Sequence, residues 1–182
     1  MWQTSDPKPQ KLIAGLLGAD VHCLEAACDA LEKQFGEIDL RSDIWDFEYT
    51  AYYRDEIGPT IIRQFVSFSK LVNPGELAQI KHDTNTLEEG LAIMLDKGYP
   101  RPINIDPGLI EPGKLVLATT KNYCHRVYIG KQMWAEVTLI YEKGAWKVMP
   151  YTYPDYRDSK YHQFFEKVRH RLLEQLKSEI SH

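Results

Sequence analysis

The sequence lacks the signatures of several protein classes. Its three cysteines, Cys23, Cys28 and Cys124, form neither a disulfide framework nor a zinc-binding CxxC pair. No apolar run approaches the ~20 residues that a membrane-spanning helix needs, and no basic segment followed by an apolar run begins the chain. We therefore expect a cytoplasmic protein that does not bind membranes.

Excess positive charge is also missing. The chain carries 22 Lys and Arg against 26 Asp and Glu, a net charge of −4. Proteins that bind nucleic acid in general need a basic surface that releases counterions from phosphate. The composition therefore disfavours nucleic acid as a partner.

Known catalytic and nucleotide-binding motifs are absent as well. The segment 15–20 contains glycines, but it lacks the Lys-Ser/Thr of a phosphate-binding loop. Neither GxGxxG nor GxSxG occurs, and no two histidines have the spacing of a zinc protease helix. These absences disfavour P-loop GTPases, kinases and Rossmann dehydrogenases, and they leave open whether the chain is an enzyme.

What is present is the composition of a globular protein, with 43% hydrophobic and 26% charged residues among 182. That length suits a single domain. Residues 1–10 are polar and contain two prolines, so we expect a flexible N-terminal lead followed by one α+β domain over residues 11–182.

Hydrophobic periodicity predicts the order of elements. It predicts strands at 11–17, 45–49, 60–68, 114–121, 125–129, 134–141 and 145–151, and helices at 24–35, 73–95 and 161–180. The beginning matches a ferredoxin-like βαββαβ pattern, and β-hairpins and a C-terminal helix follow. We expect an α+β fold in which a mostly antiparallel sheet carries helices on one face.

Polar side chains interrupt the apolar strand patterns between residues 103 and 156. Alternation places Glu136 and Thr138 on one face of strand 134–141, and Ala135, Val137, Leu139 and Tyr141 on the other. In strand 125–129, His125 and Arg126 point to opposite faces. Only one of these two is expected to join the polar face, and the sequence does not decide which.

The polar residues form a candidate site on the open sheet face. Its donors would be Arg63, Lys121 and His125 or Arg126, its acceptors Asp106, Glu136 and Asp155, and its hydroxyls Thr119, Thr120 and Thr138. Such a set suits a small anionic ligand with a phosphate or carboxylate group, bound directly or through a divalent metal. His125, Glu136 and Asp155 would supply acid–base or metal-binding groups. The simpler interpretation is a solvated sheet face.

The chain resembles the prokaryotic family called domain of unknown function 4416. The similar stretches are 65–71 (FVSFSKL), 80–85 (IKHDTN), 104–108 (NIDPG), 114–121 (KLVLATTK), 125–128 (HRVY), 135–139 (AEVTL) and 151–157 (YTYPDYR), where Tyr151 replaces the usual Trp. The family has no established activity, although some members are labelled GTP-binding. Its pattern falls on Arg63, Lys81, Asn85, Asp106, Thr120, Lys121, His125, Arg126, Glu136 and Asp155.

Three functions are compatible with the sequence. The first is binding of, or catalysis on, a small anionic molecule, with Lys81 and Asn85 added to the ligand-binding set. The second is a non-catalytic interaction module, such as a homodimer, which requires a contiguous apolar patch. The third and weakest is RNA binding through exposed Phe65 and Trp134 on the sheet.

Overall fold

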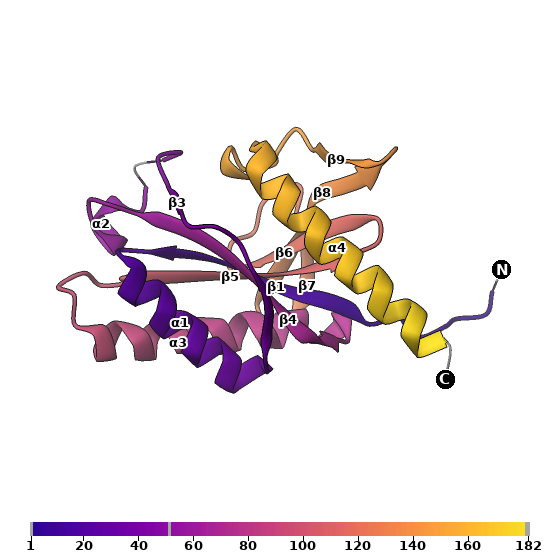
Figure 1. Ribbon diagram of the computed structural model, residues 1–182, viewed down its shortest axis with the longest axis horizontal. Helices are drawn as coiled ribbons and strands as arrows, with labels where there is room; N and C mark the ends of the chain where they lie inside the picture. The colour runs from indigo at the N-terminus through magenta and orange to yellow at the C-terminus, as the bar shows by residue number, and fades with distance from the viewer. Residues whose placement is uncertain (1, 51, 181–182) are drawn as a thin grey trace.

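The structure is a computed structural model that describes residues 2–50 and 52–180 (Figure 1). Over these residues it is an α+β fold with one nine-stranded antiparallel sheet and four α-helices. The strands are β1 (Gln10–Gly18), β2 (Ile38–Arg41), β3 (Trp45–Asp46), β4 (Ile62–Val72), β5 (Ile103–Glu111), β6 (Lys114–Thr119), β7 (Val127–Gly130), β8 (Met133–Glu142) and β9 (Ala145–Val148). The helices are α1 (Val21–Phe35), α2 (Arg54–Ile57), α3 (Leu77–Leu95) and α4 (Ser159–Ile180).

The strands are ordered β2-β4-β1-β5-β6-β8-β7, with β3 paired to β4 and β9 paired to β8. Every pairing is antiparallel. The predicted antiparallel α+β class is therefore confirmed. Strands β6 to β9 follow one another along the chain and form the hairpin-rich second half of the sheet.

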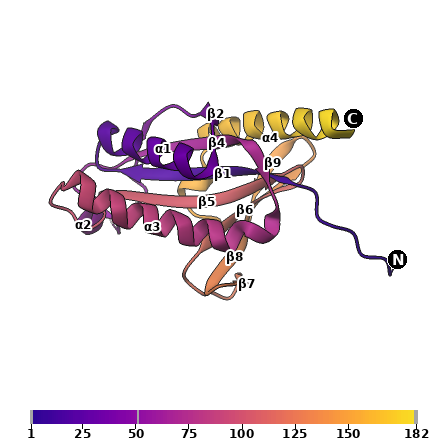
Figure 2. The same ribbon diagram turned by 90° about the horizontal axis from the view of Figure 1, so that it is seen from below.

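Strand β1 lies in the middle of the sheet and is buried on both faces. Leu12, Ala14 and Leu16 pack beneath α1 and α3, whereas Ile13 packs beneath α4. Successive side chains of a strand point to opposite faces, so a continuous apolar run requires cover on both. The expectation that the helices share one face is therefore wrong. Figure 2 shows α4 and α3 on opposite sides of the strands.

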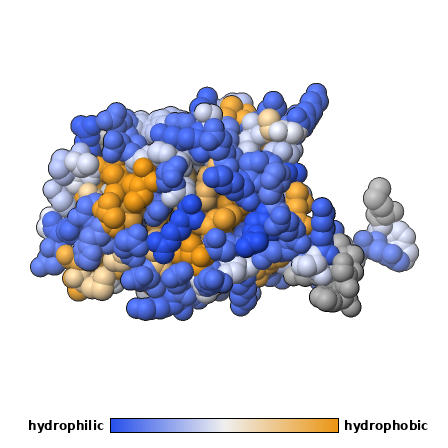
Figure 3. Space-filling model, in the orientation of Figure 1, coloured by the Kyte–Doolittle hydropathy of each residue, from blue (hydrophilic) through white to orange (hydrophobic). Residues whose placement is uncertain are grey.

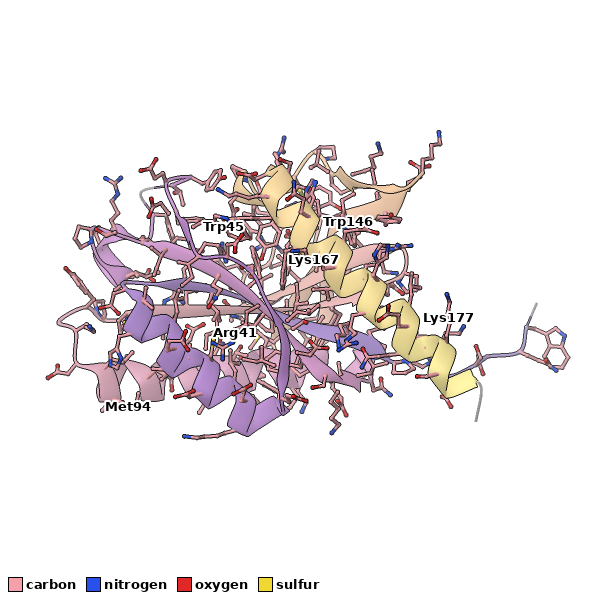
Figure 4. All side chains as sticks on the ribbon, in the orientation of Figure 1. Arg41, Trp45, Met94, Trp146, Lys167 and Lys177 are labelled. Atoms are coloured by element: carbon pink, nitrogen blue, oxygen red, sulfur yellow. The ribbon has the colours of Figure 1, made fainter. Side chains whose placement is uncertain are left out.

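Helix α4 covers its face of the sheet with an aromatic-rich stripe. Tyr161, Phe164 and Phe165 surround the ring of Phe65, which is fully buried. Trp45 and Trp146 flank this helix (Figure 4), with Trp45 against Tyr161 and Trp146 against Phe165. Because Phe65 lies in this core, it is not available to stack on an RNA base.

Polar side chains cap the N-terminal ends of α1 and of the short segment that leads into α3. Asp20 accepts a hydrogen bond from the backbone N–H of Cys23 at 2.8 Å. Asn73 accepts one from Gly75 at 2.8 Å, and Pro74 begins a short 3-10 turn (Pro74–Glu76) that continues into α3. These side chains pair backbone donors that have no partner inside a helix. The helix predicted over residues 73–95 is therefore present, and it begins with this capped 3-10 turn.

Several predicted strand boundaries differ from the structure. The prediction missed β5, which contains Pro107 and Gly108, residues uncommon inside strands, and it missed the short β2. The expected strand 45–49 is only two residues long, and the expected strand 125–129 begins at Val127.

The face of the molecule seen in Figure 3 is mainly hydrophilic. Apolar surface shows on this face mainly between α1 and α4. Residues 2–9 carry no regular secondary structure and extend from the body (Figure 2).

Candidate functional site

The sheet is incompletely closed between β5 and β6. These strands pair only from Gly108 to Glu111, so residues 103–107 of β5 have no partner in β6. A Cβ atom on Gly108 would lie 2.6 Å from Leu117 and 2.7 Å from the carbonyl oxygen of Val116. Glycine therefore permits the last close contact before the two strands separate.

Helix α3 satisfies the backbone groups that this separation leaves unpaired. The Lys81 ammonium donates to the carbonyl oxygen of Ile105 at 2.8 Å, and the Glu88 carboxylate accepts from the Ile105 N–H at 2.7 Å. Pro107, two residues along the same edge, has no N–H to donate. The open edge of β5 is thus stabilised without a neighbouring strand.

A cavity of about 840 Å³ lies where β5 and β6 separate. Its walls come from distant parts of the chain: β4, α3, β5, β6, β8, the segment around Tyr52 and the segment before α4. The polar and aromatic lining comprises Phe47, Tyr49, Thr50, Tyr52, Tyr53, Arg63, Lys81, Asn85, Glu88, Glu89, Arg101, Asn104, Asp106, Thr119, Thr120, Lys121, Arg126, Glu136, Tyr153, Asp155 and Tyr156.

The structure brings most of the predicted site residues to this cavity. Arg63, Lys81, Asn85, Asp106, Thr120, Lys121, Arg126, Glu136 and Asp155 line it, whereas His125 and Thr138 do not. The lining belongs to a cavity at the opening in the sheet and not to an open sheet face as expected.

Arg63 and Asp155 form a buried ion pair in the cavity wall. A guanidinium nitrogen of Arg63 lies 2.7 Å from a carboxylate oxygen of Asp155, and both side chains are under 10% exposed. Burial raises the pKa of Asp155, and the charge of Arg63 offsets part of that effect. Among the described residues, Nε and Nη1 of Arg63 have no hydrogen-bond partner.

Glu136 binds both residues that the strand pattern had separated. Its Oε2 atom accepts from Arg126 Nε at 2.8 Å and lies 3.0 Å from His125 Nε2. His125 and Arg126 belong to a turn before β7, where strand alternation does not apply. Contrary to the alternation, both side chains contact Glu136, but only one of the two, Arg126, lines the cavity. Arg126 lines the cavity, whereas the ring of His125 stacks on Tyr151 at 4.1 Å.

Thr138 lies outside the cavity because β8 is irregular. The pairing of β6 with β8 shifts register between Leu139 and Val137, beside Thr138. Ala135 consequently packs beneath α3, whereas Leu139 packs beneath α4. The predicted sharing of one face by Ala135 and Leu139 is thus wrong, and Thr138 is buried outside the cavity lining.

The sequence prediction missed Glu88, Arg101 and the tyrosines of the cavity. Burial raises the pKa of Glu88 to about 7, although Lys81, the Ile105 N–H and Arg101 favour its charged form. Lys81, Asn85 and Glu88 have the spacing of one helix face, so extending the family positions by one turn would have found Glu88. No comparable pattern marks Arg101 or Tyr53, which lie outside regular strands and long helices.

The described residues contain neither a candidate metal centre nor a membrane-spanning helix. Among residues 2–50 and 52–180, no group of three or more His, Cys, Asp and Glu side chains is placed to hold a metal ion. Over the same residues, no helix has the length and apolar character needed to cross a bilayer.

The fold and cavity thus define an α+β protein with an antiparallel sheet that opens around a polar and aromatic cavity. The chain matches the model of the family described as Domain of unknown function (DUF4416) over residues 8–172, and it belongs to that family. No curated protein and no solved structure matches it significantly.

Proposed function

We propose that the chain binds a small molecule with a phosphate or carboxylate group in the cavity between β5 and β6. The observation that carries this proposal is the convergence of cationic, carboxylate and aromatic side chains on one cavity of about 840 Å³. Cavities of this size with a few convergent polar groups are typical of small-molecule sites.

Unpaired buried atoms support the same proposal. Within the described residues, Arg63 Nη1, Glu136 Oε1 and the Tyr156 hydroxyl lack hydrogen-bond partners. A buried polar group without a partner costs about 1–3 kcal/mol. Each of these atoms has less than 1 Å² of accessible surface, so a ligand would pair them once the side chains of the wall shift to meet it.

Each predicted catalytic residue has a proposed role. Glu136 and Asp155 line the cavity and are the proposed acid–base or cation-binding groups. His125 contacts Glu136 and not the cavity, so we assign it the positioning of that carboxylate.

Stabilisation of the folded chain by added ligands tests the proposal. Thermal unfolding would be followed with inorganic phosphate, succinate, sugar phosphates and nucleoside mono- and triphosphates, each with and without Mg²⁺. A ligand at 100 times its Kd stabilises the folded state by about 2.7 kcal/mol, a rise in Tm of several degrees for a domain of this size.

Two adjacent substitutions on α3 provide the control. Ala92 lines the cavity, whereas Ile93 does not and is 83% exposed. We expect Ala92→Trp to abolish the ligand-induced rise in Tm and Ile93→Trp to preserve it. If no probe raises Tm, or if both variants respond like the natural chain, the proposal is wrong.

A second candidate function is self-association through β7. Val127, Tyr128 and Tyr123 are more than half exposed on and beside this terminal strand. An edge strand with apolar side chains is a template for pairing with another chain. Sedimentation should then show a dimer that Val127→Lys dissociates, whereas a monomer at high concentration would contradict this candidate.

We also propose a ferredoxin-like first half of the sheet, a prokaryotic origin and a cytoplasmic location. The order β2-β4-β1-β5, with α1 and α3 packed against the same core, supports a ferredoxin-like arrangement of the first half. A prokaryotic origin follows only from the family resemblance. The cytoplasmic location is consistent with the absence of a membrane-spanning helix in the described part of the chain.

A further inference from the structure

We propose that the ligand is a phosphorylated sugar or polyol, with its phosphate at Lys121 and its hydroxyl groups among the ion pairs of the cavity interior. This inference rests on the proposed function and names the class of ligand.

The interior cations of the cavity are already neutralised. Each has a carboxylate partner: Arg63 with Asp155 at 2.7 Å, Arg126 with Glu136 at 2.8 Å, Arg101 with Glu56 at 2.8 Å and Glu88 at 3.3 Å, and Lys81 with Asp106 at 3.6 Å. A bare anion placed among these pairs would meet at least as many carboxylates as cations. Interior charges arranged in pairs favour a neutral group with many hydrogen-bonding positions.

Lys121 is the exception among the cavity cations. Over residues 2–50 and 52–180 it forms no ion pair with Asp or Glu. Its ammonium donates to the Tyr52 hydroxyl at 2.9 Å and lies 4.7 Å from the centre of that ring. Thr119 and Thr120 precede it in the lining and add hydroxyl donors. An anionic group therefore gains most at Lys121.

The unpaired interior atoms distinguish hydroxyl groups from carboxylates. Arg63 Nη1 and Nε can only donate, whereas Glu136 Oε1 can only accept while ionised. These atoms have less than 1 Å² of accessible surface, so a ligand reaches them when the Arg63 and Glu136 side chains turn toward the cavity. A hydroxyl group both donates and accepts, so neighbouring hydroxyls would then satisfy both kinds of atom. A second carboxylate on the ligand would pair with Arg63 but would repel Glu136.

Aromatic rings supply the remaining wall. Phe47, Tyr49, Tyr53 and Tyr153 line the cavity together with the ion pairs. The C–H faces of a sugar ring are apolar and can pack against such rings, while its hydroxyl groups point toward the polar atoms. A cavity of about 840 Å³ also has room for far more than a phosphate ion.

Calorimetric titration of the full chain tests the ligand class. The probes are glucose 6-phosphate, ribose 5-phosphate and sorbitol 6-phosphate, compared with inorganic phosphate, succinate and free glucose. We expect at least one phosphorylated sugar or polyol to bind ten times more tightly than phosphate or succinate. Equal or tighter binding of phosphate or succinate would overturn this inference and leave the proposed function intact. Binding by none of the phosphorylated or carboxylated probes would overturn both.

Substitution of Lys121 tests where the phosphate lies. Lys121→Gln should weaken binding of the sugar phosphate about tenfold, the loss expected for one charge-assisted hydrogen bond, and leave the weak binding of free glucose unchanged. Lys147→Gln, an exposed lysine on β9 outside the cavity, should change neither. Unchanged affinity in Lys121→Gln, or an equal loss for free glucose, would show that the phosphate lies elsewhere and overturn the inference.

Discussion

Glu88 accepts the backbone N–H of Ile105 at 2.7 Å, at the point where β5 has no neighbouring strand. A side chain of α3 thus accepts the hydrogen bond that a neighbouring strand would otherwise accept. With Lys81 on the carbonyl oxygen of the same residue, both backbone groups of Ile105 are paired. This arrangement lets the sheet remain open beside the cavity without leaving buried backbone groups unpaired.

The first prediction concerns the charge of Glu88. Burial raises its pKa from 4.5 to about 7 in the folded chain, so the folded state holds this proton more tightly than the unfolded state does. Stability from this group is therefore full below pH 4.5 and falls as pH rises toward 7, by about 3 kcal/mol in total.

Glu88→Gln should remove that pH dependence, because the amide oxygen still accepts from Ile105 and does not ionise. Urea unfolding at pH 5 and pH 8 measures it. Glu89→Gln is the control, since Glu89 is exposed one residue away and should keep the natural difference between the two pH values. If the free energy of unfolding changed equally between pH 5 and pH 8 in the natural chain and in Glu88→Gln, this assignment would be contradicted.

The second prediction concerns the pair Arg63–Asp155. Asp155→Asn should destabilise the fold by about 3 kcal/mol, because it leaves the buried guanidinium without a counter-charge. Arg63→Met should lower the free energy of unfolding less at pH 5 than at pH 8. Burial already raises the pKa of Asp155, so without Arg63 its carboxyl group can take up a proton at the lower pH and avoid a buried unpaired charge.

A surface pair provides the comparison for these variants. Arg41 and Glu25 are 3.0 Å apart with side chains 36% and 51% exposed, so Glu25→Gln should cost under about 1 kcal/mol. Denaturant unfolding measures all three variants. An Asp155→Asn cost as small as that of Glu25→Gln would show that Arg63 does not need its partner.

The sequence predicted those parts of the fold in which local pattern and tertiary packing agree. The apolar run of β1 and the apolar stripe of α4 were both recognised, because each is buried as its periodicity requires. Strand β5 was missed because its proline lies on an edge with no partner strand, a circumstance that depends on α3 and not on local sequence.

The candidate site was predictable to a similar degree. Arg63, Glu136 and Asp155 were found because charged residues inside apolar segments are conspicuous. The roles of His125 and Thr138 were misjudged, because a turn and a register shift interrupt the alternation on which the assignment depended. Neither irregularity leaves a signal in a single sequence.

The third prediction concerns Gly15, which lies beside the Arg63 side chain. A Cβ atom there would lie 2.9 Å from Phe65, 3.0 Å from Arg63 Nη1 and 3.1 Å from the Tyr156 hydroxyl. Gly15→Ala should therefore destabilise the fold by about 1–3 kcal/mol and weaken ligand binding, because Arg63 must move. Gly90→Ala is the control: nothing lies within 4 Å of that helical position, so stability should rise by about 0.5–1 kcal/mol. A Gly15→Ala variant as stable as the natural chain, by thermal and urea unfolding, would contradict the close contact.

The last prediction concerns Lys11, whose fully buried ammonium joins β1 to β2 and α4. It lies 2.5 Å from Asp39 and donates to Gln175 at 2.8 Å. Asp39→Asn should destabilise the fold more than Lys11→Met does, because the first leaves a buried cation unpaired and the second replaces it with an apolar chain of similar length. Hydrogen exchange should show faster exchange in the last turns of α4 in Lys11→Met, where Gln175 loses the ammonium from which it accepts a hydrogen bond. The reverse order of the two costs, or exchange in α4 unchanged by either substitution, would show that Lys11 does not hold this helix against the sheet.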